Sequence, residues 1–199
     1  MSIQAPTRRS SVKSGLRTLS TAQLCLLLDF TDKDQSMRDL HDVAMIISNT
    51  GLRAGELGQL CWIDVDFERR ALCITKDKRG YMRYVPFGVK TLQILKERRE
   101  REPEADYVFG MIINRVTRQL KEACAKIGLR DVTPIVLRRT FMKSWIDSGG
   151  SITSLTKIMG WTSYPLWTKD VHGSEPGFES AARNQARIEE SQCQKIWSK

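Results

Sequence analysis

The stretch TGLRAGEL, residues 50–57, ends one predicted helix and opens the next. Gly51 stands where helices commonly end in a left-handed residue, and Arg53 lies at the start of the following helix. Glu56 comes one turn after Arg53 and can hold its guanidinium from behind, which suits this planar, permanently charged group to a phosphodiester. By spacing alone, an arginine and a glutamate three residues apart are more often a solvent-exposed ion pair.

The chain around this stretch carries mostly helical signals. Ser20 and Gln23 form a capping-box signature, and two β-like runs, 69–75 and 82–87, bracket a polar tip at 76–81. The expected fold class is therefore mainly α with a small antiparallel β-sheet (α+β). The predicted helical segments are 19–30, 37–51, the start of 53–67, 89–102, 111–128, 133–150, 151–160 and 176–197. The residues expected inward on the first two helices are Leu24, Leu27, Leu28, Leu40, Val43, Ala44 and Ile47.

The charge of the chain favours a polyanionic partner. Among 199 residues, 32 are Lys or Arg and 23 are Asp or Glu, which gives a net charge of +9. A basic protein of this kind commonly binds the phosphate backbone of nucleic acid. Residues 1–17 contain no acid, and we interpret them as a disordered, DNA-seeking arm; the alternative is a solvated tail. The basic residues of this arm are Arg8, Arg9, Lys13 and Arg17.

Several function classes lack a signal in the sequence. No apolar run is long enough to span a membrane, and no glycine-rich phosphate loop follows a strand, so neither a membrane partner nor a nucleotide cofactor is expected. Five cysteines without a CxxC pair and only two histidines argue against a metal site or a Ser/His triad. We expect buried thiols in a reducing cytosol rather than disulfides.

Four segments, read together, resemble a known catalytic domain. TGLRAGEL (50–57), ITKDKRGYMRYVPF (74–87), TPIVLRRTF (133–141) and IMGW (158–161) follow one another as in tyrosine recombinases, the phage integrase family. The resemblance covers about residues 18–175 and implies the integrase catalytic-domain fold. With only the short basic arm in front of it, the chain is most similar to the small fimbrial phase-variation recombinases, which lack the core-binding domain.

The resemblance also implies which residues surround a DNA phosphate. The two family arginines fall on Arg53 and Arg138, and the hairpin lysine falls on Lys76, with Lys78 as the alternative. Two guanidiniums could clamp the non-bridging oxygens, and a lysine could protonate the departing oxygen. The expected DNA-phosphate contacts are Arg53, Lys76, Arg138, Arg139 and Trp161.

The chain departs from the family pattern at the residues that move protons and attack phosphorus. Ile135 occupies the place of the first histidine and can neither donate a hydrogen bond nor carry a proton. Trp161 occupies the place of the second histidine and keeps one N–H donor. Asp170, nine residues later, stands where the nucleophilic tyrosine is expected, although His172 fits the register. A carboxylate is repelled by phosphate and is a poor nucleophile for reversible strand exchange.

These residues favour a DNA-binding protein on a tyrosine-recombinase fold that has lost the chemistry. It would be a transcriptional regulator or accessory factor of a mobile element such as a plasmid, cytoplasmic and associated with the bacterial nucleoid. The alternative is a divergent site-specific recombinase that uses Tyr164 or a tyrosine supplied in trans, and a third reading is a decaying pseudogene product. Residues 176–199 form a final amphipathic helix or tail that either docks on a second copy or packs on its own domain. Its predicted apolar contacts are Ala182, Ala186, Ile188, Cys193, Ile196 and Trp197.

Overall fold

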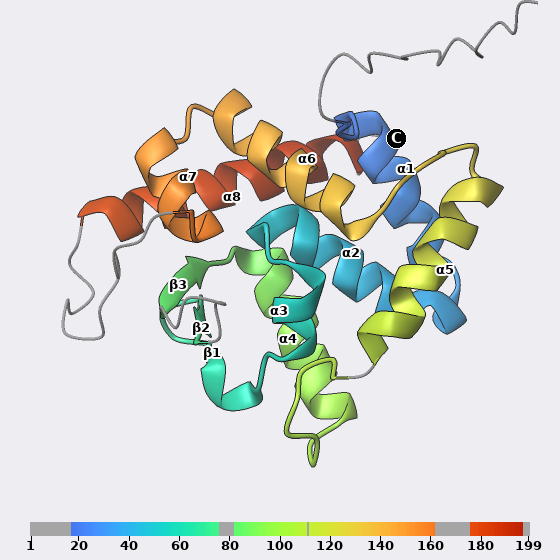
Figure 1. The fold of residues 1–199 in the computed structure, drawn as a ribbon, viewed down its shortest axis with the longest axis horizontal. Helices are drawn as coiled ribbons and strands as arrows, with labels where there is room; N and C mark the ends of the chain where they lie inside the picture. The colour runs from blue at the N-terminus through green and yellow to red at the C-terminus, as the bar shows by residue number, and fades with distance from the viewer. Residues whose placement is uncertain (1–16, 76–81, 111, 162–175, 197–199) are drawn as a thin grey trace, which may run out of the picture.

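The computed structural model describes residues 17–75, 82–110, 112–161 and 176–196, with α8 side chains described at 180–190. Helices dominate, and three short strands form one sheet (Figure 1). This confirms the predicted fold class. In chain order the elements are α1 (Thr21–Asp32), η1 (Gln35–Met37), α2 (Arg38–Thr50), α3 (Ala54–Gly58), η2 (Trp62–Asp64), β1 (Val65–Asp66), β2 (Ala71–Ile74), β3 (Arg83–Pro86), α4 (Val89–Arg101), α5 (Ile112–Lys126), α6 (Pro134–Asp147), α7 (Ile152–Met159) and α8 (Pro176–Ile196).

Helix α2 lies at the centre of the molecule. It packs against α1, α4, α5, α6 and α8, as Figure 1 shows, and its apolar residues therefore meet neighbours on several sides. The seven residues predicted to face inward on α1 and α2 are all buried. At the start of α1, the predicted capping box is present. The Ser20 hydroxyl accepts from the Gln23 backbone N–H, and the Gln23 side-chain oxygen accepts from the Ser20 backbone N–H.

The sheet is an antiparallel β1–β2–β3 ribbon. Its β2–β3 pair runs from Ala71 opposite Pro86 to Ile74 opposite Arg83, which confirms the predicted hairpin. The first strand, β1, was not predicted, because two residues are too few to show the alternation that marks a strand. The hairpin tip at 76–81 lies outside the described residues.

Gly51 turns the chain between α2 and α3 in a way that other residues would not tolerate. Its φ is +69°, in the left-handed region, and a Cβ on it would collide with the ring of Phe141 on α6. Its carbonyl accepts a hydrogen bond from the Arg138 guanidinium. The close approach of Gly51 to α6 places Arg53, two residues later, next to the first half of that helix.

Helix α8 packs against its own domain, touching α1, α2, α4, α6, α7 and β3. Of its predicted apolar contacts, Ala182 and Ala186 are only half-buried and Ile188 is buried. Ala181, which was not predicted, is buried as well. The other predicted contacts of this helix, Cys193, Ile196 and Trp197, lie outside the described side chains.

Several buried side chains of α8 are polar. Asn184, Gln185 and Glu189, which belong to this helix, are buried against the rest of the domain. The Glu189 carboxylate accepts from the Lys90 backbone N–H at 3.0 Å and from the Thr91 hydroxyl at 3.4 Å, so it satisfies donors in the first turn of α4.

The cysteines follow the expectation of buried thiols only in part. Cys25 and Cys124 are buried, but Cys61, which precedes η2, and Cys73, which lies in β2 opposite Tyr84, are half-buried. In the described part of the chain, no helix combines the length and the apolar character needed to cross a bilayer.

Candidate nucleic-acid interface

Residues that are far apart in the sequence meet in one cavity of about 490 Å³, here called the arginine cavity. It lies between the start of α3, the first half of α6 and the residue that follows the C-terminal turn of α7. The structure thus brings together five residues that the sequence analysis singled out. The lining residues are Arg53, Ala54, Pro134, Ile135, Arg138, Arg139, Met142 and Trp161.

Arg53 and Glu56 are held together as expected, but Glu56 is not the exposed partner that spacing alone favours. The Arg53 Nη1 donates to Glu56 Oε1 at 2.6 Å, and the Arg53 backbone N–H donates to Oε2 at 2.9 Å. The Glu56 side chain is only 7% exposed, whereas that of Arg53 is 45% exposed. The carboxylate therefore fixes the guanidinium from the protein side and leaves its other edge open to the cavity.

A third arginine, which the sequence analysis did not single out, shares the same carboxylate. Arg83 opens strand β3, and its Nη2 donates to Glu56 Oε2 at 2.8 Å. Burial alone would raise the pKa of Glu56, but Arg83 and Arg53, with the hydrogen bonds they donate, outweigh it and hold the pKa below its ordinary value. Glu56 therefore carries its charge at neutral pH.

Arg138 is the most buried arginine lining the cavity, at 8% exposure. Its Nη1 donates to the Gly51 carbonyl and its Nη2 donates to the Met159 carbonyl at 3.0 Å. Burial lowers the pKa of Arg138 to about 10, with a further lowering from Arg53, while Glu56 opposes the change. The group remains charged at neutral pH, and it joins α6 to the end of α2 and the end of α7.

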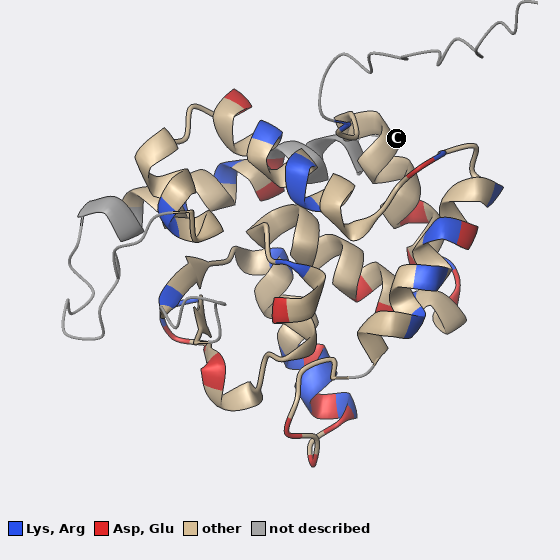
Figure 2. Ribbon diagram, in the orientation of Figure 1, with Lys and Arg blue, Asp and Glu red and all other residues tan. Residues whose placement is uncertain are grey.

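The cavity carries an excess of positive charge. Three guanidiniums, those of Arg53, Arg83 and Arg138, surround the single carboxylate of Glu56. Arg53 and Arg138 line the cavity, Arg83 lies behind it, and Arg139 is the third arginine of the lining. In helix α6, the basic residues all precede the one acid, which lies at the end of the helix, as Figure 2 shows. This arrangement attracts an anion.

Two large side chains at the cavity are exposed. Ile135 is 60% exposed and Trp161 is 46% exposed. Ile135 offers an apolar surface where the family resemblance calls for a proton-carrying histidine, whereas the indole of Trp161 still has an N–H donor.

The remaining predicted site residues lie outside the described residues, apart from Arg17. Arg17 is exposed, and its Nη1 lies 3.7 Å from Asp131 Oδ2, a surface ion pair. The predicted residues outside the described part are Arg8, Arg9, Lys13, Lys76, Lys78, Tyr164, Asp170 and His172.

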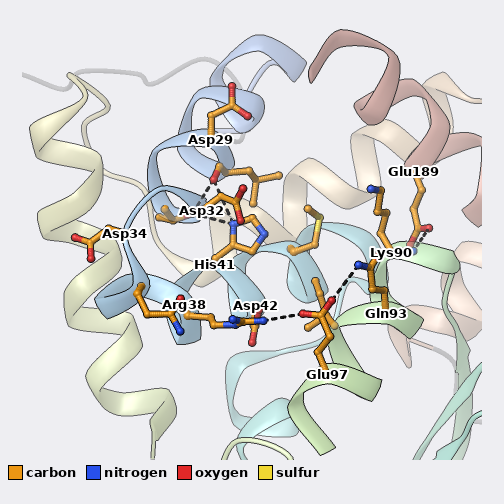
Figure 3. Close-up of a pocket in the computed structure, with 15 residues that line it drawn as sticks. Asp29, Asp32, Asp34, Arg38, His41, Asp42, Lys90, Gln93, Glu97 and Glu189 are labelled. Carbon is orange, nitrogen blue, oxygen red and sulfur yellow. Dashed lines mark hydrogen bonds and ion pairs between the residues drawn. The ribbon is translucent and has the colours of Figure 1, made fainter. Parts of the chain in front are cut away.

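A second cavity, of about 320 Å³, has the opposite character (Figure 3). It shares no lining residue with the arginine cavity. Arg38 and Lys90 are its cationic residues beside one histidine, and Arg38 is paired with Glu97 at 2.7 Å. Its carboxylates would repel phosphate, and no group of three or more His, Cys, Asp or Glu side chains in the described part of the chain could hold a metal ion. These carboxylates are Asp29, Asp32, Asp34, Asp42, Glu97 and Glu189.

Curated relatives of the chain are tyrosine recombinases. Tyrosine recombinase XerA of Saccharolobus solfataricus is 29% identical over 118 residues, which cover 59% of this chain and 40% of the relative. Tyrosine recombinase XerC of Roseiflexus castenholzii is 28% identical over 165 residues, which cover 74% and 52%. The chain thus spans about half the length of the curated relatives it matches.

Solved structures share the fold. The crystal structure of XerA recombinase superposes with a TM-score of 0.66 at 20% identity. The superposed part covers 98% of this chain and 68% of the XerA chain. The integrase from mycobacterium phage Brujita gives 0.69 at 18% identity, covering 94% and 61%. Residues 17–166, which include every described residue of the arginine cavity, match the phage integrase family. The chain therefore belongs to the phage integrase family and has the fold of a tyrosine recombinase catalytic domain.

Proposed function

We propose that the chain binds double-stranded DNA by seating a backbone phosphate in the arginine cavity, and that it does so without cutting the strand. The observation that carries this proposal is the sharing of one buried carboxylate, Glu56, by three guanidiniums. The excess positive charge is fixed in place before any ligand arrives, which favours a diester anion. A structural neighbour, a lambda integrase dimer, is bound to a COC' core site.

The proposed contacts divide by exposure. Arg53 and Arg139 present their side chains to the cavity and would bind the phosphate directly, and Trp161 would donate its indole N–H. Arg138 would contribute charge from a more buried position. Lys76 of the hairpin tip would bind the same or a neighbouring phosphate. The arm, with Arg8, Arg9, Lys13 and Arg17, would reach a groove.

The absence of cutting is proposed from two residue identities. Ile135 lines the cavity and cannot carry a proton. In the sequence, Asp170 occupies the place of the tyrosine nucleophile. Such a protein would act as a transcriptional regulator or an accessory factor of a mobile element such as a plasmid. Its place with the nucleoid in the bacterial cytoplasm follows only from the proposed DNA partner.

Replacing Arg139 by alanine is expected to flatten the salt dependence of DNA binding. Each phosphate neutralised by a cationic side chain contributes about 0.9 to the slope of log K against log salt, so the slope should fall by about that amount. Fluorescence anisotropy of a labelled duplex between about 50 and 200 mM salt measures it. Arg139 suits this test better than Arg138, because Arg138 also donates to two backbone carbonyls.

The matched control is Arg118→Ala, which removes the same charge from an exposed position on α5 outside the cavity. We expect its slope to equal that of the unchanged chain. An unchanged slope for Arg139→Ala would show that Arg139 is not part of the interface. An equal fall of the slope in Arg139→Ala and Arg118→Ala would show that binding does not centre on the cavity.

The second candidate function is site-specific recombination. It is favoured by the curated relatives, which are named tyrosine recombinases. In this chain, the reaction would use Tyr164 or a tyrosine that another subunit supplies in trans. Either residue would have to approach the phosphorus in line at about 3 Å.

A nicked suicide DNA substrate separates the two functions. We expect the purified full chain to bind it and to form no covalent adduct in denaturing electrophoresis, because Asp170 occupies the sequence position of the nucleophilic tyrosine. An adduct that disappears in Tyr164→Phe would establish the recombinase function instead. An adduct that persists in Tyr164→Phe would equally end the proposal of binding without cutting and would point to another side chain.

A second copy of the chain is a further proposed partner. In the structure, α8 packs on its own domain, and some of its own buried side chains, among them Asn184 and Gln185, are polar. Several of their side-chain atoms lack a hydrogen-bond partner within the described residues. An interface of this kind is less stable than an apolar one, which favours release of α8 to a second copy. A lambda integrase structural neighbour is a tetramer bound to a Holliday junction.

A further inference from the structure

Arg83 lies just behind the arginine cavity and joins two of its walls. The side chain is 6% exposed and is not part of the lining. Its Nη2 donates to Glu56 Oε2 at 2.8 Å, and its Nε donates to the Ile158 carbonyl at 2.8 Å. One planar group therefore connects strand β3 to the carboxylate that fixes Arg53 and to the last turn of α7.

Two arginines hold the end of α7 together. Arg83 donates a hydrogen bond to the Ile158 carbonyl, and Arg138 donates one to the next carbonyl, that of Met159. Carbonyls in the last turn of a helix have no partner within the helix and carry partial negative charge, so cationic donors satisfy them well. Trp161 leaves α7 two residues later and lines the cavity. The position of Trp161 thus depends on both arginines.

Gly160 leaves room for this arrangement. It ends α7 with a φ of +66°, and a Cβ built on it would lie 3.3 Å from the Arg83 Nη1. The guanidinium packs directly beneath the chain reversal that leads to Trp161. A side chain at position 160 would press on Arg83 and would also strain the left-handed backbone.

We infer that Arg83 is a positioning residue of the phosphate site. It sets the spacing of Arg53, Arg138 and Trp161 without contacting the ligand, because it bonds Glu56 on one side and the end of α7 on the other. This inference rests on the proposed function for its DNA readout. A lysine at this position has a single nitrogen, so it cannot bond the Glu56 carboxylate and the Ile158 carbonyl in the same fixed fork.

A double-mutant cycle in the full chain tests the inference. We expect Arg83→Met to weaken duplex binding about tenfold in the otherwise unchanged chain, and by less than about threefold when Arg53 is already alanine. Coupling of this kind arises because Arg83 acts through the residue that has been removed. Arg83→Lys should recover only part of the loss. Equal effects in both backgrounds, or full recovery by lysine, would overturn the positioning role.

A second measurement does not depend on DNA. In NMR spectra of the arginine Nε–Hε groups, Arg83→Lys should shift the signals of Arg53 and Arg138. The Arg98 signal should stay in place, because its partners lie on α2 and in the segment that follows α4. Unchanged Arg53 and Arg138 signals would refute the inference. If the signals shift but the chain does not bind duplex DNA, the proposed function fails and the positioning role stands.

Discussion

Replacing Arg98 by methionine is expected to lower the free energy of unfolding by about 3–5 kcal/mol, because it removes one side of a buried ion-pair network. Arg98 is 0% exposed. Its Nε donates to the Val108 carbonyl, its Nη1 donates to Asp39 Oδ1 at 2.7 Å, and its Nη2 donates to Glu102 Oε1 at 3.1 Å. Its Cζ also lies 4.2 Å from the centre of the Phe109 ring. Methionine keeps the apolar bulk but leaves these acceptors without their donor.

The loss should depend on pH, because a neighbouring acid is buried. Asp42 is 4% exposed, and its Oδ2 lies 3.9 Å from the Arg98 Nη1 and 2.7 Å from the Arg101 Nη2. Burial raises the pKa of Asp42, and the two arginines oppose the rise. Without Arg98 the pKa rises further. A raised carboxyl pKa favours folding at low pH, and this contribution is lost as pH rises through the folded-state value, so the deficit should be larger at pH 7 than at about pH 5.

Urea unfolding of the full chain and the variant at both pH values measures the effect. Arg118→Met is the matched control, because it makes the same substitution at an exposed position on α5. We expect the control to change the free energy of unfolding by less than about 0.5 kcal/mol. A loss of similar size in both variants would show that the network around Arg98 contributes nothing beyond helix propensity.

The partners of Arg98 could not be predicted from local sequence patterns. It lies inside KERRERE, residues 96–102, where several charged residues follow one another. Its partner Asp39 precedes it by 59 residues on another helix. By contrast, the helix ends at Ser20 and Gly51 were predictable, because capping depends on residues within one or two turns. Contacts between distant helices depend on packing that no local spacing encodes.

In the candidate site, too, some residues were predicted from the sequence and others were found only in the structure. Arg53 and Arg138 were placed by the family resemblance, and the structure brings both to one cavity. Arg83 was missed, because MRYVPF was interpreted only as a strand. The alternation of a strand puts Arg83 on the same face as Val85, which is buried, so a charged residue there must find an internal partner. That signal was present in the sequence, whereas the partner, Glu56, could come only from the fold.

Replacing Glu56 by glutamine is expected to lower the free energy of unfolding by about 3 kcal/mol at pH 7, because it leaves buried guanidiniums without their counter-charge. Glutamine has the same shape, so packing is preserved. Arg83 has 6% of its side chain exposed and cannot turn to water for compensation. Arg138 is nearly as buried, and Arg53 and Arg83 already disfavour its charged form. The variant should also bind duplex DNA more weakly, because Arg53 loses the group that fixes it.

The pH dependence distinguishes charge from shape in this prediction. The Glu56 pKa is lowered in the folded chain, so its contribution to stability is present above the ordinary value of 4.5 and is lost as pH falls through the folded-state value. The difference between the chain and Glu56→Gln should therefore shrink as pH falls below about 4.5. Glu122→Gln, at an exposed position on α5, serves as the control and should show little difference at any pH. A Glu56→Gln deficit that stays constant from pH 7 down to about pH 3 would mean that the loss comes from replacing a hydrogen-bond acceptor by an amide N–H rather than from the missing negative charge.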